Sequence, residues 1–202
     1  MATTTTQAER EDRPQWAGPR PEPTSKWANR FIFAAIVQGA IVTALTVPIV
    51  YPWVTPAVSQ VIASGSAGTW FLVGYVMYIA VGVIAVAVTA LFYHHFAINL
   101  GKPFRGRLSD ALAWVHLVFM NVGAGVAAGI LMYGGYFGER ALMPTSEGGL
   151  AEAEGLVHTT ILAPLIDPAG VALIVTGIGV LAGGAGFALA YFRRTPPQLA
   201  ER

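Results

Sequence analysis

The sequence contains no cysteine and has few charged residues for its length. Without cysteine, the chain has no disulfides, thiolate zinc sites, iron–sulfur clusters or thiol catalysis, and a cofactor would need histidine, methionine or carboxylate ligands. Charged side chains make up 11% of the residues and hydrophobic ones 54%, whereas soluble domains are typically about 25% charged. This composition argues against a soluble globular domain.

Several functional motifs are also missing. There is no Gly-Lys-Ser/Thr phosphate loop, no His-Glu-x-x-His and no Gly-x-Ser-x-Gly, so nothing indicates a hydrolase. The net charge is +1, and the basic residues are spread along the chain and not gathered on a face that could follow phosphates. We therefore expect no nucleic acid partner.

Long uncharged hydrophobic runs are abundant. An α-helix needs about 20 residues to cross a hydrocarbon core roughly 30 Å thick, and four runs reach that length. The sequence therefore predicts an all-α integral membrane protein, a four-helix antiparallel bundle embedded in a lipid bilayer. The predicted spans are about 31–50, 70–98, 109–138 and 168–192.

The distribution of lysine and arginine predicts the orientation of these spans. Eleven of the twelve lie in the two termini and the second connection, and Arg140 alone lies in the third connection. Cytoplasmic segments carry the excess of basic residues. Both termini are therefore expected in the cytoplasm, and the chain is expected to be a multi-pass protein of the plasma membrane.

The segments outside the spans differ in composition. We expect a disordered, proline-rich cytoplasmic tail at 1–27, a transmembrane domain at 28–194 and a second cytoplasmic tail at 195–202.

The third connection, 139–167, carries most of the acidic residues outside the tails and is predicted to be an acidic outer loop. A short helix is expected at 149–165, broken by Pro164 and Pro168 before the fourth span. Ser109 is the predicted N-cap of the third span.

Small and polar residues inside the spans suggest how the helices pack. Two Gly-x-x-x-Gly pairs, at Gly125 and at Gly179, allow close helix approach. They predict packing inside the bundle or, alternatively, docking against another subunit. Gln38 and Asn121 are expected to hydrogen-bond across the bundle.

Three histidines are candidate ligands. His94 and His95 lie near the end of the second span, and His116 lies about two turns into the third, at a similar depth. Two imidazoles from neighbouring spans can bind the iron of a b-type haem, so we expect His116 and either His95 or His94 as axial ligands, with His95 preferred. The alternatives are a solvated helix end with a packing histidine, or a copper site that uses methionines.

Acidic and basic residues are absent from the middle of every span. Ion-driven transporters and proton pumps carry ionisable residues at that depth. The chain is therefore not expected to work alone as a transporter or pump.

Two segments resemble a known family. Residues 113–123 (AWVHLVFMNVG) and 132–136 (MYGGY) are similar to membrane spans of the haem–copper oxidase catalytic subunits, as is the adjacent His94-His95 pair. The resemblance covers about two of the four spans. That family has about a dozen spans, more histidine ligands and a downstream His-x-His pair, so the resemblance implies a small accessory subunit.

Two functions are compatible with these observations. The first is an integral subunit of a respiratory or electron-transfer complex, not catalytic alone, that holds a b-type haem and contacts other membrane subunits. The alternative is a non-enzymatic membrane anchor or assembly subunit that binds no cofactor.

Overall fold

The computed structural model describes residues 25–53, 55–104 and 106–193, and this part of the chain is built from helices and connecting turns without a β-strand. The predicted tails at 1–27 and 195–202 lie outside it, except for the last three residues of the first tail. There Ser25 accepts a hydrogen bond from the amide of Ala28 and caps the first helix.

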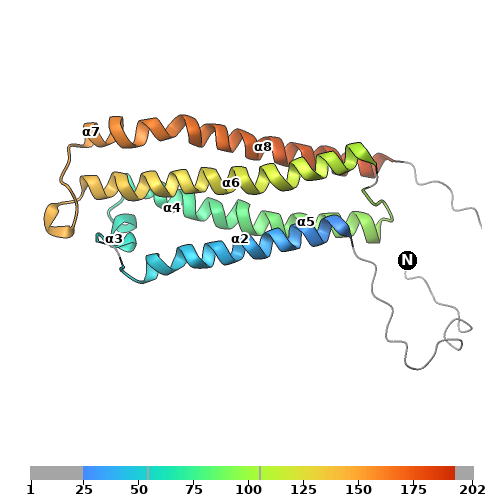
Figure 1. The fold of residues 1–202 in the computed structure, drawn as a ribbon, viewed down its shortest axis with the longest axis horizontal. Coiled ribbons are helices and arrows are strands. Elements are labelled where there is room, and N and C mark those ends of the chain that lie inside the picture. Colours follow the sequence, from blue (N-terminus) through green and yellow to red (C-terminus); the bar gives the residue numbers. More distant parts are fainter. Residues whose placement is uncertain (1–24, 54, 105, 194–202) are drawn as a thin grey trace, which may run out of the picture.

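Four helices of the described chain are long and apolar enough to cross a membrane, and they lie side by side (Figure 1). The second and fourth each contain π-helical turns between α-helical segments. Two short helices, α3 (Val58–Ala63) and η3 (Thr145–Glu147), lie in the connections. The long helices are α2 (Lys26–Val50); α4 (Gly68–Met77) with η1 (Tyr78–Ala85), α5 (Val86–His94) and η2 (His95–Asn99); α6 (Arg107–Leu142); and α7 (Glu154–Val157) with η4 (His158–Leu162) and α8 (Ala163–Phe192).

The third long helix is longer than predicted at both ends. Ser109 is not its N-cap, because α6 begins at Arg107 after Gly106, which has a φ of 99°. Glycine adopts such a backbone without steric cost. The Ser109 side chain is instead buried and accepts a hydrogen bond from Arg193 at 3.4 Å. At the other end, α6 continues to Leu142 and includes Glu139 and Arg140.

The fourth long helix begins well before its predicted start. Helix runs without a break from Glu154 to Phe192, so the prediction that Pro164 and Pro168 end a separate loop helix is wrong. Pro164 lies in the first turn of α8, directly after the π-helical turn η4. Inside a continuous helix, proline removes a backbone hydrogen bond, and local π adjustments satisfy the backbone groups that it leaves free.

Close helix contacts depend on glycine. α6 packs mainly against α8 and α4, whereas α2 packs mainly against α5. A Cβ atom at Gly123 would lie 2.7 Å from the amide of Thr176 on α8, and one at Gly179 would lie 2.6 Å from the amide of Met120 on α6. The predicted use of the Gly179 pair inside the bundle is confirmed. Gly129, in contrast, has open space beside it.

Glu139 is a buried structural residue and not part of an outer loop. Its side chain is 4% exposed, and its carboxylate accepts a hydrogen bond of 3.0 Å from the amide of Gly68. Gly68 is the first residue of α4, where helical amides lack partners within the helix and the helix dipole favours negative charge. Glu139 therefore joins the end of α6 to the start of α4.

Replacing Glu139 with alanine should lower the free energy of unfolding by about 1.5 to 3 kcal/mol, the usual range for a hydrogen bond to a charged group. Glu152→Ala, at an exposed position of the connection between α6 and α7, is the control and should have little effect. Thermal or SDS unfolding of both variants in the same detergent measures the difference. Equal stability of the two variants would refute this role.

Candidate functional site

His116 on α6 lies at the centre of an aromatic cluster. Its side chain is 4% exposed, and its Nδ1 atom lies 3.3 Å from the hydroxyl oxygen of Tyr93 on α5. The Phe31 ring of α2 has its centroid 5.0 Å from that of the imidazole, and the Phe187 ring of α8 lies 6.2 Å away at 90°. Side chains from all four long helices therefore meet here.

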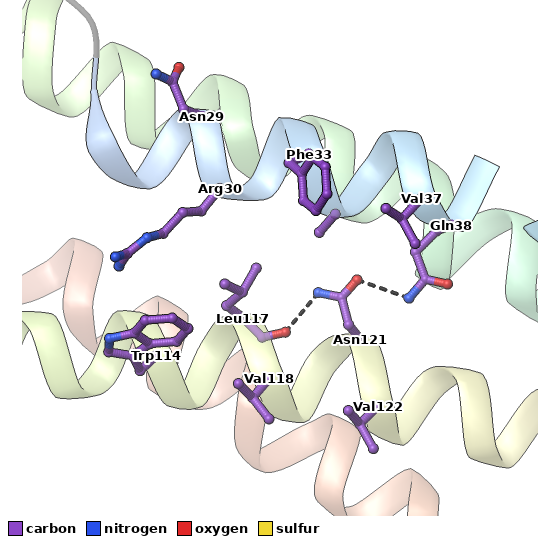
Figure 2. Close-up of a pocket in the computed structure, with 11 residues that line it drawn as sticks. Asn29, Arg30, Phe33, Val37, Gln38, Trp114, Leu117, Val118, Asn121 and Val122 are labelled. Atoms are coloured by element: carbon purple, nitrogen blue, oxygen red, sulfur yellow. Dashed lines mark hydrogen bonds between the residues drawn. The ribbon is translucent and has the colours of Figure 1, made fainter. Parts of the chain in front are cut away.

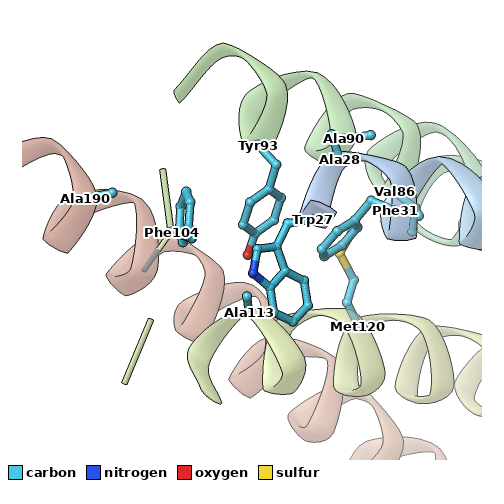
Figure 3. Close-up of a cluster of buried hydrophobic side chains, with 10 residues drawn as sticks. All are labelled: Trp27, Ala28, Phe31, Val86, Ala90, Tyr93, Phe104, Ala113, Met120 and Ala190. Carbon is cyan, nitrogen blue, oxygen red and sulfur yellow. The ribbon is translucent and has the colours of Figure 1, made fainter. Parts of the chain in front are cut away.

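The same cluster contains further buried hydrophobic residues. Tyr93 stacks on Phe31 with centroids 4.9 Å apart. Figure 3 shows the Tyr93 ring between α2 and the residues of α6 and α8. On α8, a Cβ atom at Gly183 would overlap the His116 ring. The absence of a side chain at Gly183 thus makes room for the imidazole.

The structure does not bring His94 or His95 to His116. Both side chains are exposed, and the Nδ1 atom of His95 lies 3.1 Å from the side-chain nitrogen of Asn99, a residue of its own helix. Neighbouring residues on a helix point about 100° apart. Since Tyr93 faces inward, the next two residues face away from the bundle.

The residues present do not fit a haem held between the second and third spans. A haem with two axial histidines needs both imidazoles to face each other across the macrocycle. Here Tyr93 occupies the position opposite His116, and Phe31 and Phe187 fill the space beside it. Ligation by His116, His95 or His94 stays a prediction that requires a different rotation of the second helix.

A metal cluster is not evident either. Within the described residues, no group of three or more histidine, cysteine, aspartate or glutamate side chains could hold a metal ion. Met120 and Met132, two of the methionines that the alternative copper site could use, lie in separate hydrophobic clusters.

A polar network crosses the middle of the bundle. The predicted bond between Gln38 and Asn121 is confirmed, with the Gln38 side-chain nitrogen donating to the Asn121 oxygen at 3.0 Å (Figure 2). Tyr78 of the π-helical segment donates to the Gln38 oxygen, and Asn121 donates to the Leu117 carbonyl at 2.7 Å. Tyr78 could not be identified as a member of this network from the sequence, because its neighbours are uniformly apolar.

The start of α2 holds a second group that sequence reasoning missed. Trp27 is 3% exposed and donates its ring N–H to Asp110 of α6 at 3.0 Å. The guanidinium carbon of Arg30 lies 4.6 Å from the Trp27 ring centroid and 4.4 Å from that of Trp114. In the sequence, this group was indicated only by the spacing of Asp110 and Trp114. They are four residues apart and therefore share one face of a helix.

Comparisons with models of known protein families, with curated proteins and with solved structures find no match for this chain. The resemblance to haem–copper oxidase spans therefore rests only on the residues that carry it.

Adding a methyl group beside His116 should destabilise the bundle. Gly183→Ala places a Cβ atom into the imidazole ring, and overpacking of this kind costs about 1 to 3 kcal/mol. The neighbouring variant Gly184→Ala is the matched control, because no atom lies within 4 Å of its new Cβ. Unfolding in detergent should show a large loss only for Gly183→Ala. Equal effects of the two substitutions would contradict this packing.

Proposed function

We propose that this chain is a non-enzymatic membrane subunit that anchors or assembles a larger membrane complex. The observation that carries the proposal is the packing of His116, which is enclosed by aromatic rings and bonded to Tyr93. Of the four histidines in the chain, all of them described, only His116 is buried. These contacts support a structural role for His116 in the core.

The exposed faces of the helices are apolar, which supports a location among lipids and other membrane proteins. Large apolar side chains cover the outside of α8, where Leu181 is 74% exposed and Ile174 is 64% exposed. Such residues need a hydrocarbon or protein neighbour. Both are available to a subunit of a membrane complex.

The proposed arrangement is an antiparallel bundle in the plasma membrane with both termini in the cytoplasm. The distribution of basic residues supports it, because Lys26, Arg107 and Arg193 lie at helix ends that the proposal places on the cytoplasmic side. The hydrogen bond between Trp27 and Asp110 joins the starts of α2 and α6 at that side.

Single cysteines test this topology, since the wild-type chain has none. Glu152→Cys should react with an impermeant maleimide added to intact cells, whereas Arg107→Cys should react only after the membrane is permeabilised. The wild-type chain is the unlabelled control. Reaction of both variants from the same side would overturn the proposed orientation.

Membership of a respiratory or electron-transfer complex is the second candidate. It is favoured by the oxidase-like residues 113–123, which include His116. In this case the chain would be an accessory subunit of an oxidoreductase and not catalytic alone.

Purification from its own membranes in a mild detergent separates the two candidates. For an anchor or assembly subunit, we expect recovery at a fixed ratio with other membrane proteins and no b-type α-band after dithionite reduction. An α-band that is lost in His116→Ala would establish the haem prediction instead. Recovery only as a free oligomer, without partners, would refute membership of any complex.

A further inference from the structure

An open groove runs along the outside of the bundle between α2 and α6. It has a volume of about 590 Å³ and is lined by residues from Asn29 to Gln38 on one helix and from Trp114 to Val122 on the other. The groove exists because α2 packs mainly against α5 and only lightly against α6. From Arg30 to Gln38 its length is roughly 12 Å, at 1.5 Å per helical residue.

The wall of the groove is apolar along most of this length. Phe33 and Val37 face Leu117 and Val118 across it (Figure 2). At the deep end, Gln38 and Asn121 bond to each other. A polar ligand would find few free partners there, whereas a hydrocarbon chain fits the apolar wall.

At the mouth of the groove, Arg30 provides a positive charge and an N–H donor that has no hydrogen-bond partner. The Arg30 guanidinium lies beside the Trp27 and Trp114 rings at 4.6 and 4.4 Å from their centroids. Its Nη1 atom is buried without a hydrogen-bond partner. Asp110, the nearby carboxylate, already accepts the Trp27 N–H.

This geometry is suited to a phosphate group. A guanidinium in cation–π contact with aromatic rings still carries planar N–H donors, whose geometry matches the oxygens of a phosphate. Arg30 lies at the end of the bundle that also carries Lys26 and Arg107. Basic residues at a helix end sit at the level of lipid headgroups.

We propose that this groove is a binding site for one anionic phospholipid, with its phosphate on Arg30 and one acyl chain along Phe33, Val37 and Val118. The charge at the mouth and the apolar wall below it match the two parts of such a lipid. The site requires only that the spans lie in a bilayer, so it is independent of whether the chain is a subunit of a complex.

The two tryptophans at the mouth provide a reporter. The full chain, with its other three tryptophans replaced by phenylalanine, is reconstituted into phosphatidylcholine vesicles that contain increasing fractions of phosphatidylglycerol brominated on its acyl chains. Bromine quenches tryptophan fluorescence at short range. Brominated phosphatidylglycerol should quench at a lower mole fraction than brominated phosphatidylcholine.

Paired variants separate a specific site from general attraction to charge. Arg30→Gln should raise the fraction of phosphatidylglycerol needed for half-maximal quenching about fivefold, as expected for one basic contact at a membrane surface. Lys26→Gln removes the same charge one turn away, at an exposed residue outside the groove, and should retain most of the preference. Equal losses in both variants would overturn the proposal.

A second pair tests the acyl chain without changing Arg30. Val118→Phe fills the groove and should weaken quenching by brominated phosphatidylglycerol, whereas Val171→Phe, at a lipid-facing position of α8 that is 60% exposed, should not. Unchanged quenching in Val118→Phe would overturn the proposal. Efficient disulfide-linked dimers of Val118→Cys, together with no preference for phosphatidylglycerol, would also overturn it and assign the groove to a second copy of the chain.

Discussion

The hydrocarbon environment requires each polar side chain inside the spans to find its partner within the protein, and this requirement organises the bundle. Water is absent at that depth, so an unpaired group costs several kcal/mol. Gln38 bonds to Asn121 and Tyr78 at mid-bundle, and Tyr93 bonds to His116 nearer the basic end. Because each bond joins different helices, together they set the helices' relative depth and rotation.

Glycine makes these bonds geometrically possible. α6 and α8 approach closely where Gly123 and Gly179 face the partner backbone and Gly183 faces the His116 ring. Lipid gives no hydrophobic driving force between helices, so dispersion at short range and hydrogen bonds must hold them together. α2, which has few such contacts with α6, leaves the groove beside Arg30.

The sequence predicted the number of spans and their approximate limits well, because length and hydropathy depend on the bilayer and not on packing. The helix ends were less predictable. Charged residues suggested that the third span ended before Glu139, but α6 continues to Leu142 since a helix does not stop where the hydrocarbon does. Pro164 suggested a break, but the helix continues through it directly after the π-helical turn η4, and local π adjustments satisfy backbone groups that proline leaves free.

The rotation of each helix about its axis could not be predicted, because the second span is apolar on every side and gives no periodicity to follow. This is why the histidine pairing expected from depth alone was not found. Val86, Ala90 and Tyr93 share the inward face of α5 and are buried. Turning the helix by one residue to bring His94 inward would replace Ala90 with Leu91 against α2, and overpacking of a close contact is costly. The small side chain at Ala90 therefore helps to place Tyr93, and not a histidine, opposite His116.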